Sequence, residues 1–353
     1  MAIGEERYQS ELITRVIEKG ICVNCGACVG LCPYFAYFDG RVAVMDRCGA
    51  GTGRCLQVCP RAAYTQIMRE EAKGLEGRDL SLGFYSQVLT ARAKDKYLHE
   101  EAQYGGVVTA LVCLGLEKGL FKGAVLTDRG GELSPGGALA VTPFAVKSCA
   151  GSRYSASGSL SILNKAIKDE NDGIAVVGLP CQMEALERMQ RSVPDGGDRA
   201  SKVAIRIGLF CTWALDYRKL RDFLYKNGVK GIVRKYDIPP PPAEKFVVLT
   251  EEGQKEFPLG EIRVFVQKGC YLCRDMTAEW ADISVGTMEG TAGWNTVLVR
   301  TERGKDFLDD AFKEGILEKG NLPDENLKHL IVASRNKRER GKKAESDMLR
   351  DSE

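Results

Sequence analysis

The sequence predicts a multi-domain α/β (α+β) protein in which a small cysteine-rich domain precedes a larger α/β core. Its 353 residues exceed the size at which a single hydrophobic core usually stops growing. Seven of the 13 cysteines fall within residues 22–59, where apolar residues show little periodicity. From about residue 84, apolar runs bounded by glycine alternate with helical patterns, which is typical of buried parallel strands joined by helices.

The chain divides into four segments on these patterns. Residues 1–75 are expected to form the cysteine-rich domain, which has too little apolar core to fold by burial alone and needs metal. Residues 84–170 and 171–335 are expected to be the two parts of the core. Residues 336–353 form a highly charged tail that we expect to be an exposed helix or frayed.

The composition argues against several classes of function. Hydrophobic residues make up 44% and charged residues 28%, and the net charge of +2 favours neither a nucleic acid nor an acidic partner. No apolar run approaches the roughly 18–20 residues that span a bilayer, and the first ten residues lack a signal core. We therefore expect a cytoplasmic protein without a membrane span. Only two histidines are present, which argues against histidine-based metal sites and catalytic triads.

Each expected element follows from a local pattern. Apolar residues at helical spacing, such as Val107, Ala110 and Leu114, predict a helix over 103–118. The other predicted helices cover residues 11–20, 159–168, 182–191, 216–226 and 304–313. Apolar runs predict strands over residues 123–127, 173–178, 203–210, 228–238, 246–249, 283–285 and 296–300. Four consecutive prolines at 239–242 form a rigid break.

A cysteine motif near the N-terminus predicts an iron–sulfur site. Cys22, Cys25, Cys28 and Cys32-Pro33 have the spacing C-x2-C-x2-C-x3-C-P of bacterial ferredoxins. Three cysteines at intervals of three wrap one [4Fe–4S] cluster, and the fourth turns away to a second cluster. Gly26 allows the backbone to pass close to the cluster. A disulfide origin is disfavoured, because a reducing compartment keeps thiols free.

A second half of this ferredoxin-like domain is incomplete. By pseudo-symmetry, Cys59 completes the first cluster with the first three cysteines of the run, and Cys32 joins Cys48 and Cys55 at a second. Seven cysteines cannot supply eight thiolates, so the second cluster lacks one ligand. Three outcomes stay open: a non-cysteine ligand such as Asp46, a three-iron centre, or no second cluster.

Four later cysteines predict a further metal site. Cys181 and Cys211 each follow a predicted buried strand, and Cys270 and Cys273 form a C-x-x-C pair. Cysteines at the carboxyl ends of neighbouring parallel strands point into the crevice where α/β folds bind ligands. Four thiolates there suit another [4Fe–4S] cluster, with zinc as the alternative; no strand–turn–helix unit supports a thioredoxin-like couple. Cys113, on the apolar face of a helix, is expected to be an inert core thiol.

Seven segments of the core carry a family resemblance. They are residues 103–111 (QYGGVVTAL), 150–154 (AGSRY), 178–182 (GLPCQ), 207–211 (IGLFC), 269–275 (GCYLCRD), 281–286 (ADISVG) and 293–304 (GWNTVLVRTERG). In this order they resemble the beta subunit of coenzyme F420-reducing hydrogenase and F420-dependent formate dehydrogenase. Members of that family with a fused N-terminal ferredoxin domain exist, and this chain is similar to those.

The resemblance implies a flavin- and cluster-binding core, with a bound FAD, one [4Fe–4S] cluster and a pocket where coenzyme F420 meets the flavin. The implied core-cluster ligands are Cys181, Cys211, Cys270 and Cys273. The implied FAD contacts are Gly105, Gly106, Thr109, Gly151, Ser152, Arg153 and Tyr154. From the residues alone, a glycine pair before a helix offers backbone N–H groups to a pyrophosphate, but it is also an ordinary helix start. Arg153 is, on the same terms, more often a surface charge.

The function implied is electron transfer by a subunit that contains two to three clusters. Hydride passes between FAD and coenzyme F420, or another soluble carrier such as NAD(P)H, and single electrons pass through the clusters, with the direction of flow left open. The implied partner is a hydrogenase, a formate dehydrogenase, a heterodisulfide reductase-type subunit or a membrane dehydrogenase module. No side chain is required as a catalytic acid or base. Two alternatives remain: a stand-alone flavin and iron–sulfur reductase of an organic substrate, and a flavin-free iron–sulfur electron-transfer subunit.

Overall fold

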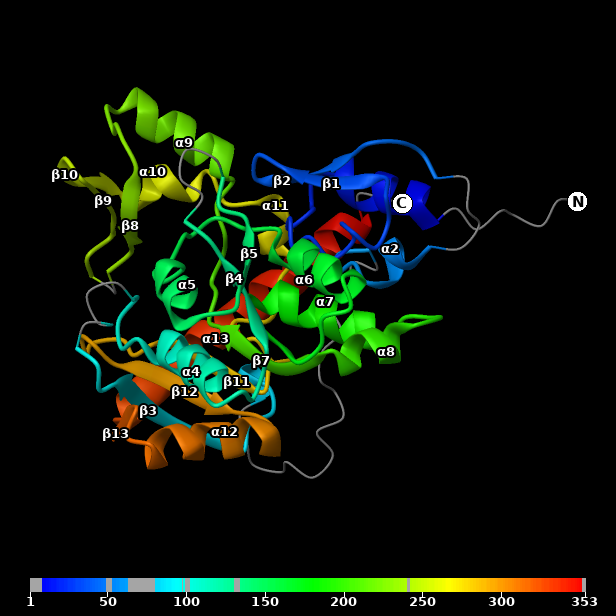
Figure 1. The fold of residues 1–353 in the computed structure, drawn as a ribbon. Helices are drawn as coiled ribbons and strands as arrows, with labels where there is room; N and C mark the ends of the chain where they lie inside the picture. The colour runs from blue at the N-terminus through cyan, green and yellow to red at the C-terminus, as the bar shows by residue number, and fades with distance from the viewer. Residues whose placement is uncertain are drawn as a thin grey trace, which may run out of the picture.

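An eight-stranded mixed sheet lies at the centre of the molecule (Figure 1). Its strands are β3 (Gln87–Ala93), β4 (Gly123–Thr127), β5 (Gly137–Ala140), β6 (Ile174–Gly178), β7 (Val203–Leu209), β11 (Ile283–Thr287), β12 (Asn295–Val299) and β13 (Leu317–Gly320). Their order across the sheet is β13-β3-β12-β11-β7-β6-β4-β5. The four inner strands β4, β6, β7 and β11 run parallel to their neighbours in this set, and the remaining pairs are antiparallel.

This computed structural model describes residues 8–48, 53–62, 80–96, 98, 102–129, 134–239 and 242–350. Helices of the core are α4 (Val107–Glu117), α5 (Pro143–Ser148), α6 (Ser159–Lys168), α7 (Pro180–Arg191), α8 (Gly196–Ser201), α11 (Lys268–Tyr271) and α12 (Glu302–Lys313), with a 3-10 turn at Leu80–Leu82.

Helices cover both faces of the sheet because its strands alternate their side chains between two apolar cores. Along β4, Ala124 and Leu126 join the core under α4 and α12, whereas Val125 joins the core under α6 and α7. Both sides of the inner strands are therefore buried, as the continuous apolar runs predict. Figure 1 shows α4 and α12 on one side and α6 and α7 on the other.

A smaller antiparallel sheet packs at one end of the core. It consists of β8 (Val233–Asp237), β9 (Lys245–Thr250) and β10 (Gly253–Pro258), with α9 (Tyr217–Lys226) and α10 (Leu259–Arg263) against it. Leu220, Phe246 and Ile262 are fully buried in its own apolar cluster.

The predicted strands of the core are all present, although the stretch 228–238 contracts to β8. The strands β5, β10 and β13 are absent from the prediction, and so is β3. In β10 and β13 the reason is visible in the sequence, because Gly-Gln-Lys-Glu-Phe-Pro and Leu-Glu-Lys-Gly offer no apolar run. The helix predicted at 103–118 begins only at Val107. The helix predicted at 11–20 is α1 (Tyr8–Leu12) followed by a π-helical turn at Ile13–Ile17.

The cysteine-rich unit docks directly on the core. It also contains the hairpin β1 (Phe35–Phe38) and β2 (Arg41–Val44) and the single turn α2 (Arg54–Gln57). The buried Nδ2 of Asn164 on α6 donates hydrogen bonds to the carbonyls of Ala27 (2.8 Å) and Val29 (2.7 Å). Gly26 has φ +81°, and a Cβ there would lie 2.5 Å from the carbonyl oxygen of Gly158. The backbone at this position therefore approaches the core too closely for any residue but glycine. The sequence analysis explained Gly26 only by the approach of the backbone to a cluster.

We expect Asn164→Ala to weaken this docking by about 2–3 kcal/mol, because it leaves two buried carbonyl groups without a hydrogen-bond donor. Hydrogen exchange of residues 21–32 should accelerate while exchange of β6 and β7 stays slow. Asn227→Ala is the control, since Asn227 is exposed and its side chain bonds only the carbonyl of Phe223 in the described part of the chain. Equal acceleration in both variants would contradict the assignment of Asn164 as a docking residue.

The charged C-terminal segment is helical up to Arg350, as one of the two expectations has it, but the helix is packed against the rest of the molecule and is not wholly exposed. The helix α13 runs continuously over Asp324–Arg350, and its end lies beside the cysteine-rich unit (Figure 1). Its buried residues are Ser334, Lys337, Gly341 and Glu345, at helical spacing. Charged side chains are tolerated because they have partners: Glu345 pairs with Arg274, and Arg338 pairs with Glu279.

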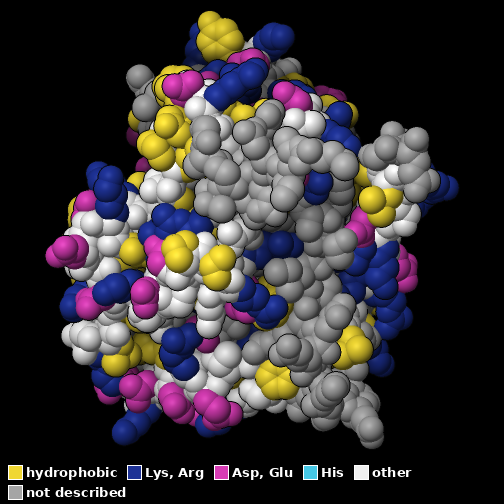
Figure 2. Space-filling model, turned by 90° about the vertical axis from the view of Figure 1, so that its right-hand side faces the viewer, with side chains coloured by type: hydrophobic (Ala, Val, Ile, Leu, Met, Phe, Trp, Pro, Cys, Tyr) yellow, Lys and Arg dark blue, Asp and Glu magenta, His cyan; other side chains and the backbone are white. Residues whose placement is uncertain are grey.

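The described surface mixes charges of both signs. Figure 2 shows the side of the molecule that lies on the right of Figure 1, where Lys and Arg are interspersed with Asp, Glu and scattered hydrophobic side chains. This agrees with the net charge of +2. Among the helices that the structure describes, none combines the length and apolarity that crossing a membrane requires.

Candidate functional site

Four cysteines of the N-terminal unit surround one small cavity. Cys22, Cys25, Cys28 and Cys59 all line a space of about 20 Å³, with apolar side chains such as Leu12 completing its wall. The first three come from the loop after the π-helical turn, and Cys59 follows α2. The structure thus brings together the four residues that pseudo-symmetry assigns to the first cluster.

Burial dominates the electrostatics of this group. It raises the pKa of Cys25 to about 12, and the pKa of Cys28 well above the ordinary thiol value, with the neighbouring sulfurs adding to the effect. Two backbone N–H groups donate to sulfur, from Asn24 to Cys22 (3.4 Å) and from Arg61 to Cys59 (3.5 Å). Thiols held neutral by burial lose their protons on binding iron, which matches the chemistry of a cluster site.

Three further cysteines of this unit form a second group. Burial raises the pKa of Cys55 to about 11, and the next contribution comes from Cys32, with Cys48 also adding, so these three lie together. Asp46 is exposed, and its carboxylate accepts a hydrogen bond from the Arg47 N–H (2.7 Å). Residues 49–52, where a fourth thiolate is missing from the sequence, lie outside the described residues.

The core cysteines converge at the carboxyl ends of β6 and β7. Cys181 lies in the first turn of α7 after β6, and Cys211 follows β7, which is the parallel neighbour of β6. Cys270 lies in α11 and Cys273 just after it. Burial raises the pKa of Cys211 to about 12, and the nearby sulfurs of Cys270 and Cys273 add to this.

The core group and the N-terminal group are neighbours. Burial raises the pKa of Cys181 well above the ordinary value, and Cys25 is the next contribution, ahead of Cys273 and Cys211. A backbone N–H of Ala214 donates to the sulfur of Cys270 (3.4 Å). Within the described residues, no three or more His, Cys, Asp or Glu side chains converge tightly enough to hold a single metal ion. A cluster is larger than one ion, so this finding concerns single ions only.

Two buried cations lie beside these cysteines, and the sequence analysis assigned a role to neither. Arg61 is 2% exposed and donates from Nε to the Gly269 carbonyl (3.0 Å) and from Nη1 to the Pro60 carbonyl (2.7 Å). Lys337, on α13, is 4% exposed and donates to the carbonyl of Cys211 (2.5 Å). The position of Arg61 two residues after a ligand cysteine is a sequence signal, whereas Lys337 has no local signal.

When the cysteines are thiolates, as they are when they bind iron, their negative charge stabilises both cations. Burial lowers the pKa of Arg61, but Cys273 and Glu184 outweigh it and the pKa is raised. For Lys337 burial is likewise outweighed, chiefly by Cys273 and Cys211. Both side chains therefore stay charged beside the core cysteine group.

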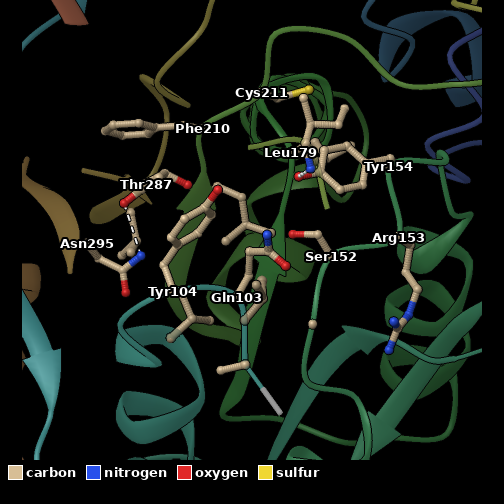
Figure 3. A pocket seen from close by; sticks show the side chains of 18 of the residues that line it. Gln103, Tyr104, Ser152, Arg153, Tyr154, Leu179, Phe210, Cys211, Thr287 and Asn295 are labelled. Atoms are coloured by element: carbon tan, nitrogen blue, oxygen red, sulfur yellow. Dashed lines mark hydrogen bonds between the residues drawn. The ribbon is translucent and has the colours of Figure 1, made fainter. Parts of the chain in front are cut away.

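A cavity of about 550 Å³ adjoins the core cysteine group. Figure 3 shows Gln103 and Tyr104 on one side of it, Ser152 and Tyr154 opposite, and the sulfur of Cys211 above them. The first turn of α4 also lines it, through Gly106, Thr109 and the two valines between them. The cavity therefore reaches from a helix N-terminus to a cysteine of the core group.

Six of the seven predicted flavin contacts line this cavity. They are Gly106, Thr109, Gly151, Ser152, Arg153 and Tyr154. Gly105 does not; a Cβ there would lie 2.7 Å from Oδ1 of Asn295, so its glycine serves strand packing. Arg153 is 7% exposed rather than on the surface, and its described hydrogen bonds go to the carbonyls of Ala150 (2.9 Å) and Asp128 (3.2 Å).

The cavity has features that fit a polar cofactor. Two buried polar atoms of its lining, Oγ of Ser155 and Oε1 of Gln103, have no hydrogen-bond partner among the described residues. Tyr104 (φ +58°) and Tyr154 (φ +54°) both hold left-handed backbone conformations, which cluster at ligand sites. Burial lowers the pKa of Arg153, so an anion bound beside it would be stabilised. Together these features suit FAD, which brings a pyrophosphate, a ribityl chain and a flat ring.

Two family models match the core. Residues 88–164 match the model described as coenzyme F420 hydrogenase/dehydrogenase, beta subunit N-term, and residues 171–325 match the companion model for the C terminus of that beta subunit. Among solved structures, a chain of the F420-reducing [NiFe] hydrogenase complex from Methanosarcina barkeri superposes with a TM-score of 0.69 at 30% identity. That match covers 75% of this chain and 93% of that chain.

Curated relatives agree with these matches. The coenzyme F420 hydrogenase subunit beta of Methanothermobacter thermautotrophicus is 33% identical over 241 residues, which cover 67% of this chain and 85% of the relative. The coenzyme F420-dependent sulfite reductase of Methanocaldococcus jannaschii is 32% identical over 323 residues, or 86% of this chain. The chain spans about half the length of that relative, because the match covers 48% of it.

The fold and site define a class first: mixed α/β proteins in which grouped buried cysteines adjoin a large cavity at the carboxyl ends of parallel strands. Within that class, the chain belongs to the family of coenzyme F420 hydrogenase/dehydrogenase beta subunits, whose members serve in oxidoreductases. The family resemblance and the fold class expected from the sequence are confirmed.

Proposed function

We propose that this chain is an iron–sulfur flavoprotein subunit that transfers electrons between coenzyme F420 and a partner redox subunit. The observation that supports it best is an unbroken series of neighbouring sites. Cys211 lines the large cavity and belongs to the core group, and Cys181 of that group neighbours Cys25 of the N-terminal unit. The names of the relatives supply the carrier, coenzyme F420.

The large cavity is the proposed site for FAD. The N-terminal turn of α4, from Gly106 to Thr109, offers backbone N–H groups to the pyrophosphate, and Arg153 offers a buried cation. Ser155 and Gln103 offer the unpartnered polar atoms described above. When bound, FAD supplies the exchange between two-electron hydride chemistry and one-electron transfer. The apolar walls of the cavity exclude water from the reacting ring.

The cysteines are the proposed ligands of clusters arranged in series. The core group is Cys181, Cys211, Cys270 and Cys273, and the next group is Cys22, Cys25, Cys28 and Cys59. Cys32, Cys48 and Cys55 form the outermost group, whose fourth ligand and iron count stay open. Cys28 neighbours Cys55, so the two N-terminal groups adjoin. The outermost group lies furthest from the cavity along this series, and the partner protein is proposed to meet the chain there.

Anaerobically purified protein should contain one flavin and about twelve irons if all three groups hold [4Fe–4S] clusters, and about eight if only two do. Reduced coenzyme F420 should bleach the flavin rapidly, because the cavity brings the carrier to the ring, while NADH and NADPH should not. Absorbance at the flavin band in a stopped-flow instrument measures both.

Other outcomes separate the alternatives. Protein that holds iron and sulfide but no flavin would favour a cluster-only electron-transfer subunit. Four-cysteine zinc in the core group would appear as zinc without the matching sulfide. A flavin reduced by NADPH but not by the deazaflavin would contradict the proposed carrier. Reduction of an added organic acceptor without any partner would favour a stand-alone reductase.

A further inference from the structure

A buried ion pair joins the N-terminal and core cysteine groups. Nη1 of Arg61 lies 3.7 Å from Oε2 of Glu184, and the two side chains are 2% and 0% exposed. Oε1 of Glu184 also accepts a hydrogen bond from Nε of Arg188 (3.0 Å). A pair this deep costs desolvation energy that an apolar pair would not, so its presence calls for a reason other than stability.

The two partners are anchored at ligands of different groups. Arg61 follows Cys59 by two residues, and its backbone N–H donates to the sulfur of Cys59 (3.5 Å). Glu184 follows Cys181 by three residues on α7, which places the two on the same side of that helix. The guanidinium reaches across to the core group by donating to the carbonyl of Gly269, next to Cys270.

The charge of Arg61 acts on cysteines of both groups. Among the described residues its charge favours the thiolate of Cys22, Cys25 and Cys59 on one side and of Cys181 and Cys270 on the other. At Cys55 of the outermost group, the main contributions come from burial, Cys32 and Cys48, and Arg61 is not among them. Nη2 of Arg61 is buried without a hydrogen-bond partner in the described part of the chain, and a cluster sulfur would satisfy it.

We propose that Arg61, set against Glu184, is a positioning residue that tunes the reduction potentials of the core cluster and the adjacent N-terminal cluster together, so that electrons pass readily between them. This inference rests on the proposed function. Reduction adds a negative charge to a cluster, and a buried cation stabilises that charge in a low dielectric, which raises the potential. One cation between two clusters raises both, and Glu184 limits the size of the effect.

The test is an EPR-monitored reductive titration of the anaerobically purified holoprotein, with signals assigned through Cys25→Ser, Cys55→Ser and Cys211→Ser. Arg61→Met should shift the potentials of the core cluster and the adjacent cluster to more negative values. Glu184→Gln should shift both to more positive values, because Arg61 then lacks its counter-charge. Arg61→Lys should restore most of the wild-type values. The outermost cluster should keep its potential throughout.

Arg206→Met is the matched control. Arg206 is also a mostly buried arginine in an ion pair, with Glu187 (3.1 Å), but its described partners include no cysteine. Potentials unmoved in Arg61→Met, or moved in the same direction by both Arg61→Met and Glu184→Gln, would overturn the inference. If Arg61→Met does not assemble, the sign of the shift in Glu184→Gln decides alone. Wild-type protein without iron would instead refute the proposed function.

Discussion

Serine in place of Cys25 is expected to remove about four irons per chain and to interrupt electron transfer, while flavin content stays unchanged. Cys25 is the sulfur through which the N-terminal group neighbours the core group, and it lines the small cavity with its three companions. A hydroxyl is a poor ligand for iron, so the middle cluster should be lost. Reduced coenzyme F420 should still bleach the flavin, since the large cavity is untouched, but the EPR signal of the outermost cluster should no longer appear.

Cys113→Ser provides the control for this variant. Cys113 is a residue of α4 whose side chain is buried in the aliphatic core, where its thiol faces the carbonyl of Pro143, and it belongs to none of the three groups. It should retain its iron and its full electron transfer, with at most a modest loss of stability. If Cys25→Ser loses its flavin as well, or keeps all its iron, the proposed series of separate flavin and cluster sites would be wrong.

The strands that carry the site were predictable from sequence because they are buried on both faces. The run at β6 is a continuous apolar stretch and the run at β7 is apolar apart from Arg206, and patterns of that kind have few alternatives. The positions of Cys181 and Cys211 after those strands then followed from the parallel topology. The polar edge strands β10 and β13 offered no such pattern, and tertiary pairing alone makes them strands.

The sequence analysis did not identify residues whose roles depend on contacts with distant segments of the chain. Lys337 reaches the Cys211 carbonyl only because the whole of α13 lies across the core, and its charged sequence suggested solvent instead. In the sequence, Glu184 looks like an ordinary polar residue of an amphipathic helix. Its role depends on the ion pair that it forms in the folded protein with Arg61 of the cysteine-rich unit. The resemblance implied a flavin contact at Gly105, and the structure adds a second constraint there, because its backbone packs on β12 and β3. Pairings between distant segments cannot be read from local spacing.

Valine in place of Gly106 is expected to weaken flavin binding by about tenfold or more. Gly106 caps α4 at φ +69° and lines the large cavity. A side chain in that conformation costs about 1–2 kcal/mol, and a Cβ there would also press within 3.3 Å of the Cβ of Leu98. The first turn of α4 must then shift, and with it the backbone N–H groups proposed to face the pyrophosphate. Flavin released by denaturation, and the Kd for FAD added back, measure the loss.

The same helix supplies the matched control at its other end. Gly119 follows α4 at φ +67°, nearly the same conformation, but nothing lies within 4 Å of the Cβ position and the residue is no part of the cavity wall. Gly119→Val should therefore lose a similar amount of stability and keep its flavin. Equal flavin loss in the two variants would mean that α4 stability alone governs binding. Unchanged flavin in Gly106→Val would remove the helix N-terminus from the proposed site.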